Sequence, residues 1–210
     1  MSDSFPGAVT SIDQLRQHYR APSKLVQSKK VTVLDEPTRA FIAASPFVLL
    51  ATTDASGRCD VSPRGGAPGF VRIVDDHRLL LPDLNGNNLL DSLQNVVVNP
   101  SVGLLFVLPG RDETLRVDGH AVVTVDDEIL SSFTDIRRPT SAIGITVEHA
   151  FIHCAKSFRR GNVWDADRWA ELVAPTALEL LQCHLNMPEP IDPARMEAGY
   201  AADLAADAPA

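Results

Sequence analysis

Residues 62–69 have the composition of a loop that could bind a phosphate group. They read Ser-Pro-Arg-Gly-Gly-Ala-Pro-Gly and follow a predicted strand, so glycines and prolines hold the backbone open and stiff around Arg64. The arginine guanidinium is planar, permanently charged and well matched to phosphate oxygens. The alternative interpretation is an ordinary turn that carries a solvated arginine.

A second candidate lies where a predicted strand gives way to a predicted helix. Leu81–Asp83 ends the strand, and residues 85–88 (Asn-Gly-Asn-Asn) open the helix. The start of a helix leaves backbone N–H groups unpaired and carries partial positive charge, so it favours an anion. Asn87 or Asn88 could instead cap its own helix, and that role is compatible with ligand contact.

Two further cationic features lie outside these segments. Arg116 is on the polar side of a long alternating strand, where an ion pair with Asp118 or Glu113 is the alternative to ligand binding. Lys156–Arg160 (Lys-Ser-Phe-Arg-Arg) is the densest basic run of an acidic protein. Such a run binds an anion in some proteins and is a solvated face in others.

Most familiar catalytic and metal motifs are missing. The sequence contains no G-x-G-x-x-G, G-x-x-x-x-G-K-[ST], G-x-S-x-G or H-E-x-x-H pattern. His149, His153 and Cys154 fall in a strand pattern, where a spacing of four residues does not bring side chains together, so no metal site is predicted. Cys183 and His184 fit an amphipathic helix that begins at Thr176. No side chain is identified as a nucleophile or base.

Composition narrows the class of protein. The 210 residues carry a formal net charge of −8, which argues against a general nucleic-acid binder, because such a protein needs a basic face. The longest apolar runs, such as Phe47–Ala51, are far shorter than the roughly 20 residues of a membrane span, and no secretory signal is visible. Three cysteines without a close pair predict no disulfide framework, so we expect a cytoplasmic protein.

The elements that must position these residues are mainly strands. Helices are predicted from Ser11, with Gln14 completing a capping box, to about Tyr19, from Asp35 to about Ser45, and over residues 88–99. Strand patterns occur over eight ranges, 47–53, 59–62, 69–74, 78–81, 102–108, 114–125, 142–147 and 151–154, and we expect them to form about six or seven short strands. Short strands with few helices between them favour a small closed or half-closed barrel over a doubly wound parallel sheet. The fold class is therefore mainly β with α.

The same pattern divides the chain into four parts. Residues 1–45 form an N-terminal helical extension, 46–165 the barrel and 166–187 C-terminal helices. Residues 188–210 are rich in Ala, Asp, Glu and Pro, which predicts a mobile tail or a marginal helix.

Taken in order, these segments resemble the pyridoxamine 5'-phosphate oxidase-like family of FMN-binding split barrels, from about Pro46 to Trp164. The resemblance is carried by Ser62–Gly65, Leu80–Asp83, Gly86–Leu89, Asn99–Phe106, Thr114–Gly119 and the stretch from His153 to Trp164. It implies a six- to seven-stranded antiparallel split β-barrel with flanking helices, and a flavin bound at a homodimer interface. The sequence departs from the family oxidases at Asn88, where they carry a lysine, and lacks their C-terminal Trp-x-x-Arg-x-x-Pro. These departures point away from pyridoxamine phosphate oxidation itself.

The resemblance also implies the residues that hold FMN. On one subunit they are Ser62, Arg64, Pro82, Asp83, Asn87 and Asn88, with Arg116 near the same face. The other subunit would add Lys156 and Arg159. The expected function is an oxidoreductase that transfers a hydride between flavin and a small-molecule substrate. The alternative is a non-catalytic flavin, deazaflavin or haem binding or sensor protein.

Overall fold

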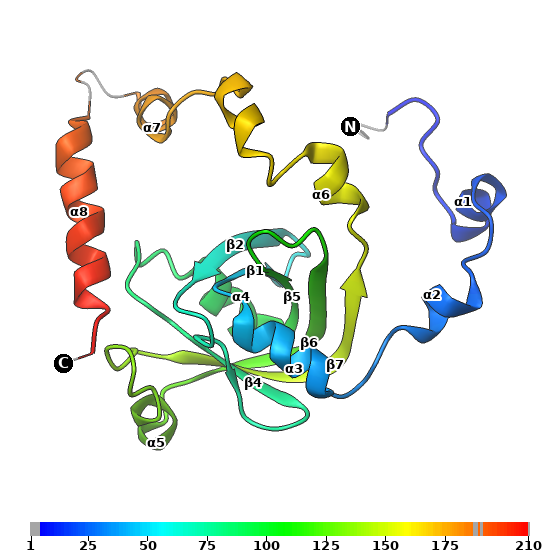
Figure 1. Cartoon of the computed structure of the whole chain (residues 1–210), viewed down its shortest axis with the longest axis horizontal. Helices are drawn as coiled ribbons and strands as arrows, with labels where there is room; N and C mark the ends of the chain where they lie inside the picture. Colours follow the sequence, from blue (N-terminus) through cyan, green and yellow to red (C-terminus); the bar gives the residue numbers. More distant parts are fainter. Residues whose placement is uncertain (1–4, 187–188, 190, 210) are drawn as a thin grey trace.

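The computed structural model describes residues 5–186, 189 and 191–209, and its centre is a single curled antiparallel sheet (Figure 1). The strands follow the order β2-β1-β5-β6-β7-β4-β3. Their bounds are β1 Phe47–Thr53, β2 Cys59–Gly65, β3 Arg72–Ile73, β4 Arg78–Pro82, β5 Ser101–Val107, β6 Thr114–Thr124 and β7 Ala142–His153. The predicted six- to seven-stranded antiparallel split β-barrel with flanking helices is confirmed.

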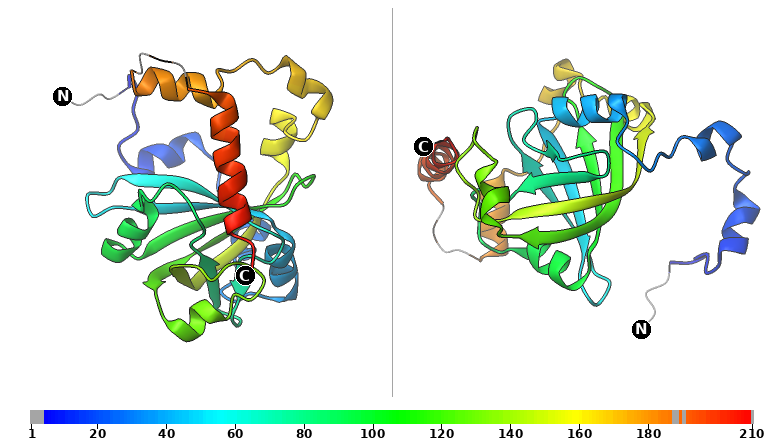
Figure 2. Two further views of the ribbon diagram at one scale, coloured as in Figure 1. Left: turned by 90° about the vertical axis from the view of Figure 1, so that its left-hand side faces the viewer. Right: turned by 90° about the horizontal axis from the view of Figure 1, so that it is seen from below.

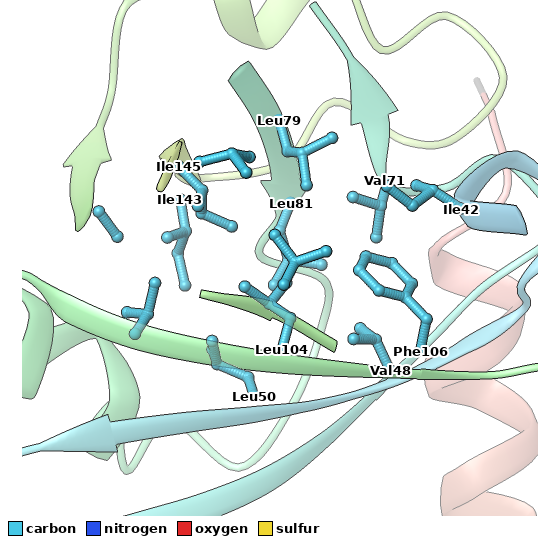
Figure 3. Packing of buried hydrophobic residues seen from close by; sticks show 14 of the residues in the cluster. Ile42, Val48, Leu50, Val71, Leu79, Leu81, Leu104, Phe106, Ile143 and Ile145 are labelled. Atoms are coloured by element: carbon cyan, nitrogen blue, oxygen red, sulfur yellow. The ribbon is translucent and has the colours of Figure 1, made fainter. Parts of the chain in front are cut away.

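The sheet curls because one face of almost every strand is apolar. Figure 3 shows side chains from β1 and β5 facing those from β4 and β7 across one core. The labelled members on these strands are Val48, Leu50, Leu79, Leu81, Leu104, Phe106, Ile143 and Ile145, all at most 2% exposed. Burial of this continuous apolar surface is the main favourable term in folding.

Strand β7 is continuous, whereas the sequence pattern predicted two strands, over 142–147 and 151–154. A register shift explains the difference: Val147 pairs with Gly119 and His149 pairs with Asp118, which leaves Glu148 as an extra residue. Such a bulge moves the following side chains to the opposite face, so the alternation of apolar and polar residues breaks at this point.

Strand β2 is longer than predicted, because it continues through Pro63 and Arg64 to Gly65 instead of ending at Ser62. β2 is an edge strand, paired only with β1 in the described part of the chain. An edge strand tolerates proline, since the missing N–H need not pair with a neighbour. The segment that looked like a stiff loop is therefore half strand.

Three helices lie against the barrel: α3 (Glu36–Ala44), α4 (Asp91–Val98) and α5 (Asp127–Ser131). The predicted start of α3 is confirmed, since the Thr38 N–H donates to Asp35 Oδ1 at 3.0 Å. Its Ile42 and the preceding Leu34 are buried in the core, so the end of the N-terminal extension belongs to the barrel.

The remaining helices lie outside the barrel and bury no residue. They are α1 Ile12–His18, α2 Lys24–Ser28, α6 Lys156–Gly161, the 3-10 helix η1 Ala166–Glu171, α7 Ala177–His184 and α8 Pro193–Ala206. Figures 1 and 2 show α1 and α2 standing clear on one side, while α6 to α8 form an arch that ends beside the barrel. The capping box at Thr176 is present at the start of α7.

The predicted tail, 188–210, contains α8, while residues 188, 190 and 210 lie outside the described residues. Among the described helices, none combines the length and apolar character needed to cross a membrane.

Candidate ligand site

One cavity of about 440 Å³ lies where the ends of β2 and β4 meet the start of α4. Six predicted site residues line it: Ser62, Arg64, Pro82, Asp83, Asn87 and Asn88. They come from three segments that span nearly thirty residues of sequence, and the fold brings them together.

The β2 wall presents its side chains by strand alternation. Ser62 and Arg64 are paired with Leu50 and Val48, whose side chains face the core, so both residues lie on the inner side of β2 and are half-buried. Pro63 between them faces the other way. The Ser62 hydroxyl lies 2.9 Å from the hydroxyl of Ser92 on α4. β2 thus directs one hydroxyl and one cation into the cavity.

Asp83 stands on the opposite wall, at the end of β4. Its N–H donates to Ser141 O at 2.9 Å, which ties this wall to the segment before β7. Partial burial raises the pKa of the Asp83 carboxyl, and the nearby Arg64 charge opposes that rise. The two groups therefore interact electrostatically across the cavity.

The start of α4 differs from the prediction. The helix begins at Asp91, not at Asn88, because Asn88 and Leu90 have left-handed backbone conformations with φ of 57° and 60°. A branched residue such as leucine rarely adopts this conformation, and such strain tends to collect at functional sites. Leu90 is the N-cap and supplies no side-chain hydrogen bond to the helix.

The alternative in which Asn87 or Asn88 caps the helix is wrong. The Asn87 side chain accepts a hydrogen bond from the Leu89 N–H at 3.1 Å instead. The first turn of α4 therefore has N–H groups without a side-chain cap, and the segment Leu90–Leu93 lines the cavity. An uncapped helix start that faces a cavity favours an anion there.

A second cavity of about 370 Å³ adjoins the first along the loop after β4. It adds two cations, Arg137 and Arg138, from the loop before β7. Sequence reasoning missed these arginines, although a dibasic pair before a proline was visible as a possible anion-binding loop.

The end of helix α8 and the following residue, Asp207, lie at one side of the cavities. Asp207 lines both of them and Leu204 lines the first. Asp207 Oδ1 accepts from the Asn85 N–H at 3.2 Å, Asp203 Oδ1 accepts from Asn85 Nδ2 at 3.1 Å, and the Asp207 carbonyl accepts from the Arg137 N–H at 2.8 Å. These contacts join residues about 70 to 120 positions apart, so no local pattern could have predicted them.

The other three predicted residues lie elsewhere in the chain. Arg116 is on the outer face of the sheet, where its Nε donates to Asp118 Oδ1 at 2.7 Å, which is the ion pair considered as the alternative. Arg159 on α6 donates to Asp112 Oδ2 at 2.8 Å, and Lys156 is the first residue of the same helix. None of the three lines the cavity within its own chain.

The Gly66 N–H donates to Pro46 O at 3.1 Å, so it is committed within the protein. In the described part of the chain no three His, Cys, Asp or Glu side chains gather as a metal site would require. The three cysteines are exposed and unbridged.

No curated protein sequence matches this chain. Among solved structures, it is similar to HupZ of Group A Streptococcus, with 19% identity, a TM-score of 0.48, and coverage of 56% of this chain and 92% of that one. A proposed pyridoxamine 5'-phosphate oxidase from Lactobacillus delbrueckii has 23% identity and a TM-score of 0.47, covering 59% and 98%. HutZ, the haem storage protein of Vibrio cholerae, has 16% identity and a TM-score of 0.38, covering 57% and 94%.

A match to a family model shows which protein family this chain belongs to. Residues 34–154, which are over half of the chain, match the model described as pyridoxamine 5'-phosphate oxidase. The matched region begins at buried Leu34 and ends just after β7, so it includes the barrel core and the parts of the cavity formed by β2, β4 and α4, but not α8. This chain is a member of the pyridoxamine 5'-phosphate oxidase family.

Proposed function

We propose that this protein binds FMN in the cavity between β2, β4 and α4 and uses it in the oxidation or reduction of a small molecule. The observation that carries the proposal is the meeting of Arg64 and the uncapped start of α4 at one cavity of about 440 Å³. Ligand pockets for molecules of this size have volumes of roughly 300 to 1,000 Å³. A guanidinium and free helix N–H groups are the donors that a phosphate monoester needs.

The lining of the cavity favours a flavin over haem. Among the described residues that line it there is no histidine, cysteine, methionine or tyrosine. These four side chains are the usual axial ligands of haem iron. The described lining therefore offers polar and apolar contacts, which suit a flavin better than haem iron.

The residues that line the cavity carry more acidic than basic groups, so binding of a phosphate requires further cations. Of the described residues that line it, Arg64 is the one cation, while Asp83, Asp91 and Asp207 are acidic. FMN phosphate carries nearly two negative charges at neutral pH, by analogy with other phosphate esters. Arg137 and Arg138 of the adjoining cavity are one source of cations, and Lys156 and Arg159 of a second subunit are the other.

A homodimer has a suitable surface on the outer face of the sheet. Two rows of small or apolar residues cross β2, β1 and β5, and each ends at a charged residue of β6. The rows are Pro63, Leu49, Leu105, Arg116 and Val61, Ala51, Gly103, Asp118. An apolar centre with a polar rim is typical of protein interfaces, and a two-fold axis would place the same face on both subunits.

The chemistry that FMN supplies when bound is hydride exchange with a small molecule. The residues of this chain bind and orient: Arg64 neutralises phosphate, and the walls exclude water. The adjoining cavity of about 370 Å³ gives a substrate room, and Arg137 and Arg138 favour one with an anionic group.

Purified protein is expected to carry FMN at about one molecule per chain, or to take it up when FMN is added. The measurement is an absorption spectrum before and after denaturation, with mass determination of the released chromophore to separate FMN from a deazaflavin. Added FMN at 100 times its Kd should stabilise the protein by about 2.7 kcal/mol through mass action.

Colourless protein that FMN does not stabilise would exclude the proposal, and a Soret band would establish haem instead. Anaerobic mixing of the flavin-loaded protein with NADH, NADPH and other donors tests turnover. Lack of flavin reduction by every donor would leave a binding protein without redox activity.

A shared site predicts complementation between two inactive variants. Arg64→Ala and Lys156→Ala/Arg159→Ala should each lose FMN as homodimers. After subunit exchange, each mixed dimer has one site with both lesions and one with neither, so about half of the mixed-dimer sites should bind FMN by isologous symmetry. Fluorescence quenching of FMN measures the recovery, and native mass spectrometry verifies exchange.

Two controls interpret this experiment. Asp112→Ala breaks the ion pair of Arg159 but keeps both cations, so it should retain FMN. If Arg137→Ala/Arg138→Ala also loses FMN as a homodimer, mixing it with Arg64→Ala should give no recovery, because those arginines border the cavity of their own chain. Verified exchange without recovery in the first mixture would show that the site is not shared.

A further inference from the structure

Three polar contacts join α4 to the β1–β2 hairpin at the edge of the core. The Asn95 amide Nδ2 donates to Thr52 Oγ1 at 3.0 Å and to Asp60 Oδ2 at 2.6 Å. The hydroxyls of Ser92 and Ser62 lie 2.9 Å apart. Asn95 is 6% exposed, and Thr52 and Ser92 are also buried. We call these contacts of Asn95 and Ser92 the polar ladder.

The spacing of the polar ladder matches a helix lying against a strand. Ser92 and Asn95 are three residues apart on α4 and therefore share one face of the helix. Asp60 and Ser62 are two residues apart on β2 and share one face of the strand. Ser92 and Asn95 are about 4.5 Å apart along the helix axis, and Asp60 and Ser62 are about 6.6 Å apart along the strand. These lengths are similar enough for Ser92 to contact Ser62 while Asn95 contacts Asp60. The contacts align α4 antiparallel to β2.

Apolar packing alone would leave the position of α4 less well defined. Val96 is the buried apolar residue of this helix, and Leu93 is partly buried. Contacts between aliphatic side chains depend weakly on direction, whereas hydrogen bonds require defined distances and angles. The start of α4 lacks a side-chain cap, and its local hydrogen bond, from Gln94 Nε2 to Leu89 O at 3.0 Å, stays within the same segment. The polar ladder is the directional contact that ties this start to the sheet.

The position of α4 matters for the cavity, which lies one helical turn from Asn95. Asn95 does not line the cavity, but Leu90–Leu93 of the same helix does. A shift or rotation of α4 would move the uncapped N–H groups relative to Arg64. Displacements of about 1 Å are large on the scale of a hydrogen bond, whose donor–acceptor distance spans 2.7–3.2 Å.

We infer that Asn95 is a positioning residue for the anion site: through Asp60 and Thr52 it holds the start of α4 where its N–H groups meet the phosphate of FMN beside Arg64. The inference rests on the proposed FMN binding and adds the residue that organises it. Asp60 is exposed on its strand, so its carboxylate is the outer anchor and Thr52 the buried one.

The test exchanges the two partners. Asn95→Asp keeps the shape of the side chain but places a carboxylate against Asp60, which breaks the contact. The double variant Asp60→Asn/Asn95→Asp restores it in reverse, because the new amide donates to the new carboxylate. Asn99→Asp is the matched control: it is the same change at the other end of α4, and a carboxylate can keep the bond from the Ser101 N–H at 3.1 Å.

Titrations with FMN and riboflavin separate the phosphate from the rest of the ligand. Asn95→Asp should raise the Kd for FMN about tenfold or more relative to that for riboflavin, because a contact that places a charge is lost. The exchanged double variant should return to within about threefold of the original ratio, and Asn99→Asp should stay there. The ³¹P resonance of bound FMN should move in Asn95→Asp and return in the double variant.

An unchanged FMN-to-riboflavin ratio in Asn95→Asp, together with lower stability towards urea, would overturn the inference and leave Asn95 a purely structural residue. If Asn95→Asp does not fold, Asp60→Ala removes the exposed anchor only and should shift the ratio in the same direction by about threefold. No shift in that variant also overturns the inference.

If the original protein binds no FMN, the proposed function fails and hydrogen exchange of the apo protein decides the positioning role. Amides of residues 94–98, which are hydrogen-bonded within α4, should exchange faster in Asn95→Asp and recover in the double variant. Equal exchange rates in all three proteins would refute positioning by Asn95.

Discussion

Arg64→Glu is expected to raise the Kd for FMN by about 100-fold or more, since removing one partner of a desolvated charge pair costs roughly 2–5 kcal/mol and each 1.4 kcal/mol is tenfold. The substitution places a carboxylate where the phosphate needs a cation, near Asp83 with its raised pKa. Fluorescence titration with FMN and with riboflavin measures the effect, which should be much smaller for riboflavin because it lacks the phosphate.

The folding stability of Arg64→Glu should change by about 1 kcal/mol or less, because the side chain is only half-buried. Arg20→Glu changes the charge equally at an exposed residue outside the barrel and should leave both affinities as they are. Equal weakening of FMN and riboflavin, or a large loss of stability in urea unfolding, would make Arg64 a structural residue.

Gly119→Ala should destabilise the barrel by about 3 kcal/mol or more, which is the upper range for overpacking a core. A Cβ at this position would lie 2.1 Å from the Thr146 carbonyl oxygen and 3.0 Å from its carbon. Both atoms are backbone of β7, so relief requires separation of β6 from β7 at the bulge. Urea unfolding followed by circular dichroism measures the change.

Gly144→Ala is the matched control on the same pair of strands. Its Cβ would meet Val122 Cγ2 at 3.6 Å and Leu80 Cδ2 at 3.7 Å, which are ordinary van der Waals contacts. We expect a change of at most about 1 kcal/mol, within the range of well-tolerated apolar changes. Similar unfolding free energies for the two variants would show that the bulge accommodates a side chain.

Alternation of apolar and polar residues was sufficient to predict most of the barrel. Strand β1 has the predicted bounds Phe47–Thr53, because its buried face repeats every two residues and neighbouring strands cover it. The pattern failed at Glu148, where the bulge adds a residue, and at Pro63, which an edge strand accepts. Both failures depend on pairing between strands, which a single segment of sequence does not encode.

The cavity was predictable where its residues lie in recognisable segments. Residues 62–64 and 82–88 stand at the ends of strands, and family resemblance placed them in one site. The left-handed Leu90 was not predictable, because leucine disfavours that conformation and only the surrounding structure imposes it. The role of Asp207 in the cavity was not predictable for a different reason, because its contact with Asn85 joins residues 122 positions apart. A single sequence without aligned relatives contains no signal for such a pairing.

Helix α8 makes the wall of the cavity that is least firmly attached. It buries none of its residues, and Leu204 remains 73% exposed although it lines the cavity. Its hold on the loop after β4 and on Arg137 consists of three hydrogen bonds. Opening this wall costs a local unfolding free energy far below that of the barrel. For the proposed ligand, a change that loosens only this wall should speed entry and release by the same factor, which shortens the residence time and leaves the Kd unchanged.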